Sequence, residues 1–254
     1  MTIQVSKPED RPYRLVLVYG PTGAGKSWFG ASAESRLGGR TLIAMTEDSD
    51  SGLTGFDVDL VPVRGMEQLK QLVRDLRADP GPYKDGVLVL DSLTQLERFA
   101  DAEEAEAEYR RQTTKTPLQV TQEAYGRMQE DIRRTIWATR TLPLNIVLVC
   151  LDKLFTDKND VTIRLIGPNL TPRLSGDIRA YSDVVGYMTA ETLDVQSKDG
   201  KTERRLVRRL FLQPGHDFAA RARAGKGVVI PEFIASPTIE KLLAIFKPKE
   251  EAKT

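Results

Sequence analysis

Cysteine and histidine are almost absent from this chain, which contains one residue of each, Cys150 and His216. A single cysteine excludes an internal disulfide and predicts a reducing compartment, here the cytoplasm. A single histidine with no cysteine near it argues against a metal cluster. Every Ser-His-Asp or Cys-His arrangement would have to use His216, so hydrolysis by such a nucleophile is not expected. We expect Cys150 to be an inert thiol of the core.

The chain also lacks long apolar runs and an excess of charge of one sign. Its longest apolar runs, such as 15–19 and 146–151, are far too short to span a membrane, and its N-terminus has no apolar signal segment. Lysine and arginine number 37 against 36 for aspartate and glutamate, so the formal net charge is +1. This balance excludes a uniformly basic coat for nucleic acids, although it permits local patches. We expect no membrane partner.

Short apolar runs alternate with helical stretches along most of the chain. Strands are predicted at 13–19, 41–45, 58–63, 87–90, 146–151 and 183–188. Several of these runs are continuously apolar, which is typical of strands buried on both faces of a parallel sheet. Helices are predicted at 26–36 and 66–78, and from Thr116 onward, where Thr-Pro-Leu-Gln offers a capping box with proline at the first helical position.

This alternation predicts an α/β fold with a mostly parallel, twisted sheet flanked by helices. The segment 205–213 follows a turn at Asp199-Gly200 and has the pattern of a strand, so we expect an antiparallel extension near the C-terminus. The 254 residues divide into a flexible lead-in at 1–12, one domain at 13–246 and a charged tail at 247–254.

The most specific motif follows the first predicted strand. It fits the pattern G-x-x-x-x-G-K-[ST] and consists of Gly20, Pro21, Thr22, Gly23, Ala24, Gly25, Lys26 and Ser27. Its glycines let consecutive backbone N–H groups turn toward an anion, and a predicted helix follows directly. Lys26 is placed to reach the β- and γ-phosphates of a nucleotide, and the Ser27 hydroxyl to ligate Mg²⁺. The alternative is a glycine-rich turn that carries a lysine by chance.

Two carboxylates follow predicted strands that end at the same sheet edge as this loop. Asp91 ends an apolar strand where a P-loop protein needs a ligand for Mg²⁺, and its alternative role is a helix N-cap. The next residue is Ser92, so a catalytic carboxylate has to come from elsewhere. Glu47 follows the strand 41–45, and we predict that it orients the attacking water. A role for Asp48 instead, or a solvated loop charge, is the alternative.

Together these motifs resemble the RecA-like P-loop ATPases. The loop GPTGAGKS looks like their phosphate loop, Glu47 matches their catalytic glutamate, and Leu-Asp-Ser-Leu at 90–93 looks like their metal-binding strand. Size and motif order are most similar to the short phage-encoded RecA-like proteins of single-strand annealing and recombination. The resemblance spans about residues 13–235 and implies ATP and Mg²⁺ as cofactors.

The resemblance also implies arginine fingers and a sensor. RecA-like proteins carry a basic-x-Arg-x-Gly stretch that reaches the γ-phosphate of the neighbouring subunit, and Arg221 and Arg223 match it. These arginines join Lys26 and Glu47 as catalytic candidates, and a solvated basic turn is the alternative. Asp152 lies near the sensor position, where the family usually has Gln or His, and a carboxylate would meet a γ-phosphate differently from an amide.

Single-stranded DNA is expected at two loops, one after the metal-binding strand and one after the sensor strand, again because of the resemblance. The corresponding zones contain basic residues and few aromatics, so contact with the DNA backbone should dominate. The candidates are Arg110, Arg111, Lys115, Lys153, Phe155, Lys158, Arg164 and Arg173. Residues 198–226 add nine basic residues against three acidic ones, which fits either a phosphate-backbone groove or solvated surface.

We therefore expect a Mg²⁺- and ATP-dependent ATPase that forms homo-oligomers, as a ring or a filament, on single-stranded DNA and supports annealing or recombination. The resemblance also implies a single-strand binding protein as partner. Two alternatives remain. One is a nucleotide-dependent assembly module with little turnover. The other, with less support, is a P-loop kinase of small molecules, which would need an arginine-rich lid that does not stand out in this sequence.

Overall fold

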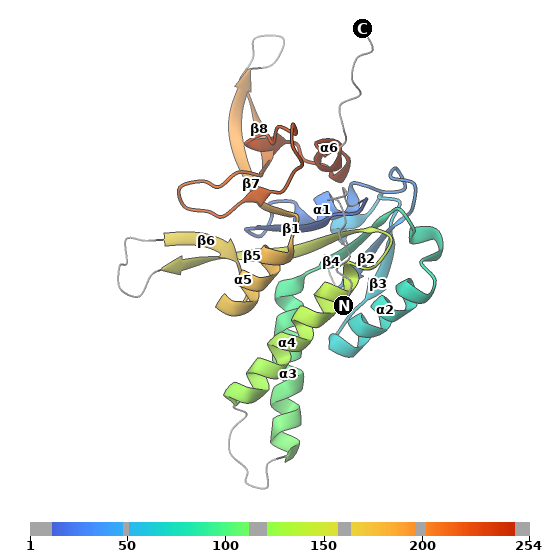
Figure 1. Ribbon diagram of the computed structural model, residues 1–254. Helices are drawn as coiled ribbons and strands as arrows, with labels where there is room; N and C mark the ends of the chain where they lie inside the picture. Colours follow the sequence, from blue (N-terminus) through green and yellow to red (C-terminus); the bar gives the residue numbers. More distant parts are fainter. Residues whose placement is uncertain (1–11, 48–50, 112–120, 157–163, 197–201, 247–254) are drawn as a thin grey trace, which may run out of the picture.

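The computed structural model describes residues 12–47, 51–111, 121–156, 164–196 and 202–246 (Figure 1). Its centre is one sheet of ten strands: β1 (Leu15–Gly20), β2 (Thr41–Met45), β3 (Asp59–Pro62), β4 (Val87–Asp91), β5 (Asn145–Thr156), β6 (Arg164–Pro168), β7 (Val184–Gln196), β8 (Thr202–Phe211), β9 (Arg221–Ala222) and β10 (Phe233–Ala235). Their order is β10-β8-β7-β1-β5-β4-β2-β3, with β6 beside β5 and β9 beside β7. The strands from β7 to β3 pair in parallel, as predicted.

Helices cover both faces of this sheet. They are α1 (Lys26–Ala31), α2 (Met66–Ala78), α3 (Leu93–Arg111), α4 (Gln122–Thr139), α5 (Pro172–Tyr181) and α6 (Ile239–Ala244), with short 3₁₀ turns η1 (Ser51–Leu53) and η2 (Gly81–Tyr83). Alternate residues of β1 belong to different buried clusters. Leu15 and Leu17 pack with α2, α3, α4 and α5, whereas Val16 and Val18 pack with α1 and α6. The central strands are continuously apolar because both of their faces are buried.

Two antiparallel hairpins project past the end of β1 (Figure 1). β1 ends at Gly20, opposite Leu151 of β5, which continues to Thr156 and pairs with β6. β7 pairs with β1 up to Tyr187 and continues to Gln196, paired with β8. The β5–β6 pair points to the left of Figure 1 and the β7–β8 pair rises at its top. The β7–β8 pair is the antiparallel extension that the sequence predicts near the C-terminus.

The first helix is shorter than predicted, because α1 ends at Ala31 rather than at residue 36. The Ser32 hydroxyl donates to the carbonyl oxygen of Phe29 at 2.6 Å and accepts the N–H of Ile239 at 3.0 Å. Ser32 therefore joins the end of α1 to the start of α6, and these two segments lie 207 residues apart in the sequence. A local pattern does not reveal such a contact.

The start of α4 also differs from the prediction. Thr121 is the N-cap, and its hydroxyl oxygen accepts the N–H of Ala124 at 3.2 Å. The helix therefore begins at Gln122 and not near Thr116, which lies outside the described residues with the rest of 112–120. Thr121 offers the same hydroxyl cap as Thr116, although Thr116 has the stronger local pattern.

Residues 1–11 of the predicted lead-in and the whole predicted tail at 247–254 lie outside the described residues. In the part of the chain that the structure describes, no helix combines the length and the apolar character needed to cross a membrane.

Candidate nucleotide-binding site

The loop between β1 and α1 is shaped by its glycines. A side-chain carbon at Gly20 would lie 2.1 Å from the carbonyl oxygen of Met188, so β7 passes too close for a larger residue. Gly23 and Gly25 have φ angles of +81° and +94°, in the left-handed region that favours glycine. The N–H of Phe29 then donates to the carbonyl oxygen of Gly25 at 2.8 Å as α1 begins. The motif therefore has the strand–loop–helix setting that a phosphate loop requires.

Lys26 folds back over the loop. Its ammonium donates to the carbonyl oxygens of Gly20 and Pro21, both at 2.7 Å, and the residue is 8% exposed. Burial lowers the pKa of Lys26, while the nearby carboxylates, Asp91 first among them, oppose this shift. A phosphate in the loop would offer the ammonium a charged acceptor in place of two neutral carbonyls, and such bonds are about twice as strong.

Asp91, at the end of β4, lies beside Ser27. The Ser27 hydroxyl hydrogen-bonds to the Asp91 carboxylate. Burial raises the pKa of Asp91, and this bond and the charge of Lys26 act in the opposite direction. The pair offers two hard oxygen ligands, which fits Mg²⁺ because this ion takes one or two protein oxygens and completes its shell with phosphates and water. Within the described residues, no group of three or more His, Cys, Asp or Glu could hold a metal alone.

Glu47 lies at the same edge of the sheet because β2 is the neighbour of β4. The N–H of Thr46 donates to the carbonyl oxygen of Asp91 at 2.8 Å, and the Thr46 hydroxyl accepts the N–H of Ser92 at 2.7 Å. Glu47 follows directly and is exposed. Its carboxylate interacts electrostatically with both Lys26 and Asp91. The structure thus brings Glu47 to the phosphate loop.

Asp152 lies on β5 directly after Leu151, the residue that pairs with Gly20. It is half-buried, and its carboxylate interacts electrostatically with Lys26 and Tyr19. The sensor candidate therefore reaches the same loop as Glu47 and Asp91. Each of these carboxylates comes from a different parallel strand or its end, which is where such sheets gather functional residues.

A family model described as an AAA domain matches residues 12–224. This chain belongs to the AAA domain family. Its fold is similar to that of a solved structure described as an ATPase domain, with a TM-score of 0.50 and 12% identity over 89% of this chain and 81% of that one. For FlaH, a flagellar accessory protein of Methanocaldococcus jannaschii, the TM-score is 0.45 and the identity 10%, over 87% and 84%. No curated protein matches the chain.

The AAA domain thus has a RecA-like P-loop fold, with a mostly parallel sheet, helices on both faces and antiparallel strands at one side. Family and fold together support a nucleotide-binding P-loop ATPase. The Ser27–Asp91 pair and Glu47 lie beside the phosphate loop of this fold.

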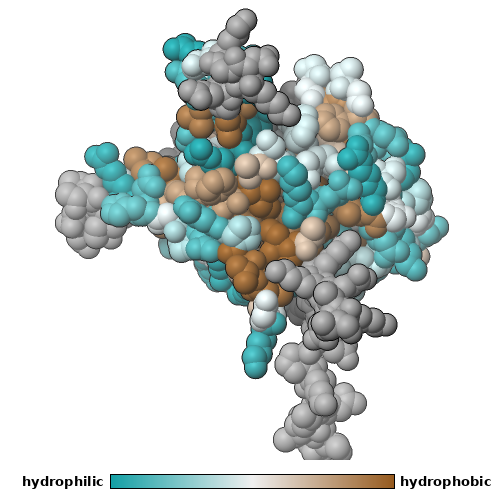
Figure 2. All heavy atoms as spheres, turned by 90° about the horizontal axis from the view of Figure 1, so that it is seen from above, coloured by the Kyte–Doolittle hydropathy of each residue, from teal (hydrophilic) through white to brown (hydrophobic). Residues whose placement is uncertain are grey.

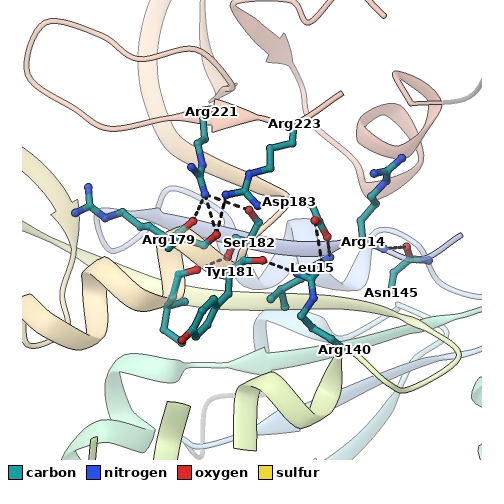
Figure 3. A network of polar contacts seen from close by, with 12 residues as sticks. Arg14, Leu15, Arg140, Asn145, Arg179, Tyr181, Ser182, Asp183, Arg221 and Arg223 are labelled. Carbon is teal, nitrogen blue, oxygen red and sulfur yellow. Dashed lines mark hydrogen bonds and ion pairs between the residues drawn. The ribbon is translucent and has the colours of Figure 1, made fainter. Parts of the chain in front are cut away.

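Arg221 and Arg223 of the AAA domain contact the end of α5 (Figure 3). Arg221 donates to the carbonyl oxygens of Arg179, Ala180 and Ser182, and Arg223 donates to that of Ala180 at 2.9 Å. Because β9 pairs with the first residues of β7, both arginines lie toward the N-terminal ends of the parallel strands. The phosphate loop lies at their C-terminal ends, so these arginines do not reach the nucleotide site of their own chain.

The DNA candidates separate into three groups. Lys153, Phe155 and Arg164 lie on the β5–β6 hairpin, where the Lys153 ammonium is 5.9 Å from the centre of the Phe155 ring. Arg173 lies apart from them, in a small cavity between α4 and α5. Arg110 and Arg111 end α3, and their side chains, like Lys115 and Lys158 altogether, fall outside the described residues.

The basic stretch at 198–226 is less open to an anionic partner than its composition indicates. Three of its arginines form ion pairs with acids of the same hairpin: Arg204 with Asp194, Arg205 with Glu203 and Arg209 with Glu191. Arg221 and Arg223 bind the carbonyls of α5 instead. Five arginines of the described part of this stretch, 202–226, therefore already bind groups of their own chain.

Two residues of the AAA domain have contacts that the sequence does not predict. Glu97 is buried, and both of its carboxylate oxygens accept the N–H of Thr171, at 3.1 and 3.2 Å. Arg208 of β8 packs against Gly25 of the phosphate loop. Neither has a local signal, because Glu97 belongs to an acidic helix and Arg208 is one of several arginines in its strand.

Proposed function

We propose that this AAA domain hydrolyses Mg·ATP and assembles with copies of itself on single-stranded DNA, where it supports annealing or recombination. The contact between Ser27 and Asp91 beside the phosphate loop carries the catalytic part of this proposal. Backbone N–H groups of Gly20–Ser27 and the ammonium of Lys26 hold the phosphates. Bound Mg²⁺ would be held by Ser27 and Asp91 and would neutralise charge on the phosphates.

Glu47 serves as the base in this proposal. Its exposed carboxylate accepts a proton from water while the water oxygen forms a bond to the γ-phosphorus. The bond between that phosphorus and the bridging oxygen breaks, and ADP leaves. Lys26 stays bound to the phosphate oxygens on which charge gathers. Asp152, on β5 between β1 and β4, would respond to the loss of the γ-phosphate.

The position of Arg221 and Arg223 supports the assembly part of this proposal. They are at the far end of the sheet from their own phosphate loop, so any contact with a γ-phosphate has to involve a neighbouring copy. In that role the two guanidinium groups leave the carbonyls of α5 and stabilise charge in the neighbour's transition state. Hydrolysis then depends on assembly.

The β5–β6 hairpin is the surface that we propose for DNA. It extends past the body of the sheet and shows mostly hydrophilic side chains with a hydrophobic area at the left of Figure 2. Lys153 and Arg164 are exposed there, and Leu154 and Leu165 are 50% and 37% exposed. With one aromatic ring, Phe155, backbone contact should outweigh base stacking, so affinity should fall steeply with salt.

One set of measurements tests these parts separately. ATP hydrolysis and particle mass are measured with and without single-stranded DNA for the native protein, Lys26→Ala, Glu47→Gln and Arg223→Ala. We expect Lys26→Ala to lose nucleotide binding, Glu47→Gln to bind nucleotide but lose turnover, and Arg223→Ala to lose turnover only. Arg204→Ala removes an arginine whose side chain is 82% exposed and serves as the control. Full turnover by Lys26→Ala would contradict the site.

The assembly and DNA parts have their own contradicting outcomes. DNA-stimulated turnover that survives Arg223→Ala in a strictly monomeric protein would exclude the role in a neighbouring site. For DNA, Lys153→Ala with Arg164→Ala should weaken binding and reduce its salt dependence, whereas the exposed Lys84→Ala should not. A binding curve that does not change between low and physiological salt would contradict the hairpin as a DNA surface.

A second function, nucleotide-dependent assembly with little turnover, is favoured by Asp152 at the sensor position. A carboxylate there repels the γ-phosphate, whereas an amide would donate a hydrogen bond to it. Under this alternative, particle mass responds to ATP but turnover stays near background. Asp152→Asn would then raise turnover, and this outcome separates the two functions.

A further inference from the structure

The side chain of Arg208, on β8, lies directly against the phosphate loop. An ideal side-chain carbon at Gly25 would lie 2.6 Å from Arg208 Nε and 2.8 Å from its Cδ. Arg208 Nε is buried and has no hydrogen-bond partner among the described residues. A buried donor without a partner costs free energy, and the cost is larger for a charged group.

The other arginines of the same strand are neutralised. Arg204, Arg205 and Arg209 each form an ion pair with an acid of the β7–β8 hairpin. No ion pair of Arg208 is found within the described part of the chain. Arg208 therefore places a second cation next to the loop that already contains Lys26, and no acid among the described residues forms an ion pair with it. This arrangement is stabilised when an anion lies between the two groups.

The order of the strands shows which part of a nucleotide Arg208 would meet. The Mg²⁺ ligands Ser27 and Asp91 and the base Glu47 define the side of the terminal phosphates, and β4 and β2 lie on that side of β1. The nucleoside end must leave the loop on the other side. That side is formed by β7 and then β8, where Arg208 lies.

We propose that Arg208 binds the α-phosphate of the nucleotide held by its own chain. This inference rests on the proposed nucleotide site and adds a residue to it. A group bound to the α-phosphate does not touch the bond that breaks, so Arg208 would contribute equally to the ground state and the transition state. Such a residue changes KM and leaves kcat unaltered. Arg208 should also strengthen the binding of ADP as much as that of ATP, because both contain the α-phosphate.

The test is a titration of ATP and of ADP in the absence of DNA. The variants are Arg208→Ala, Arg208→Lys and, as control, Arg204→Ala, which removes the same charge from an exposed position of the same strand. We expect Arg208→Ala to weaken both nucleotides by roughly 10- to 100-fold, the range for a lost hydrogen bond to a charged group. Arg208→Lys should recover part of this loss, because it retains the charge without the planar fork. Arg204→Ala should bind like the native protein.

Three results of this titration would overturn the proposal. They are unchanged affinity of Arg208→Ala for both nucleotides, a loss confined to ATP, and an equal loss in Arg204→Ala. The unfolding temperature without nucleotide separates a binding role from a packing role. We expect the unfolding temperature of Arg208→Lys to equal that of the native protein. A large fall in its unfolding temperature without loss of nucleotide affinity also overturns the proposal. If the native protein binds nucleotide no better than Lys26→Ala and neither binds it measurably, the proposed nucleotide site is wrong. That result differs from a failure of the role proposed for Arg208 alone.

Discussion

The carboxylate of Asp183 accepts the backbone N–H of Leu15 at 2.9 Å, although the two residues lie 168 positions apart (Figure 3). Its other oxygen accepts a hydrogen bond from Arg140, at the end of α4, at 3.2 Å. One side chain therefore joins the starts of β1 and β7 to a helix. The ion pair is largely buried, with side chains 11% and 10% exposed.

Removal of this carboxylate should destabilise the fold strongly. In Asp183→Ala, the Arg140 charge stays buried without its partner, and the Leu15 N–H loses its acceptor. We expect the free energy of unfolding to fall by about 3–5 kcal/mol, measured by urea denaturation. Asp194→Ala is the matched control, because Asp194 pairs with Arg204 on the surface and should contribute about 0–1 kcal/mol. Equal effects of the two changes would contradict this role.

Glu97 should make stability depend on pH. Burial raises the pKa of Glu97 above its usual value, and the bonds from Thr171 only partly oppose this. The folded protein then keeps this proton to a higher pH than the unfolded chain does, so the free energy of unfolding falls as pH rises through that window. Glu97→Gln removes the charge and still offers Thr171 an acceptor oxygen.

We therefore expect the unfolding temperature of Glu97→Gln to match that of the native protein near pH 4 and to exceed it near pH 7. Differential scanning fluorimetry across this range measures the difference. Glu232→Gln, at an exposed position, should change the unfolding temperature little at either pH. If the native protein is more stable than Glu97→Gln near pH 7, burial does not determine the direction of the Glu97 pKa shift.

The two glycines Gly20 and Gly126 should respond to alanine with opposite signs. A side-chain carbon at Gly20 would collide with the backbone of Met188, which cannot move without shifting β7. We expect Gly20→Ala to lower the free energy of unfolding by about 1–3 kcal/mol or more. At Gly126, inside α4, no atom lies within 4 Å of such a carbon, so Gly126→Ala should add roughly 0.5–1 kcal/mol. Urea denaturation of both variants distinguishes the signs.

Cys150 should be unreactive while the protein is folded. Its side chain is fully buried, and burial raises the pKa of the thiol well above its usual value. The reactive thiolate is therefore scarce and inaccessible. We expect no labelling by an aromatic disulfide reagent at pH 8 in buffer and full labelling in denaturant. Ala102→Cys, at an exposed position of α3, should react rapidly in buffer, and rapid labelling of Cys150 in the native protein would contradict its burial.

Much of the fold follows from local patterns. The predicted bounds of the strand Thr41–Met45 and of the helix Met66–Ala78 are confirmed. The apolar runs identify strands buried on both sides, and the rule that parallel strands end at one edge brings Glu47 and Asp91 to the phosphate loop. Two helix ends were wrong. The hydroxyl of Thr121 caps α4 although Thr116 has the stronger local pattern, and the end of α1 depends on Ser32 meeting Ile239.

The phosphate loop, the carboxylates beside it and the parallel sheet can be read from the residue order, because each depends on neighbouring residues or on a rule that relates strand ends. The part that each arginine plays depends instead on how the chain packs. Arg204 and Arg208 lie on one strand with similar surroundings in sequence, yet one pairs with Asp194 and the other lies against Gly25. The register of the β7–β8 hairpin and its position beside β1 produce this difference, and both depend on contacts between residues far apart in the chain.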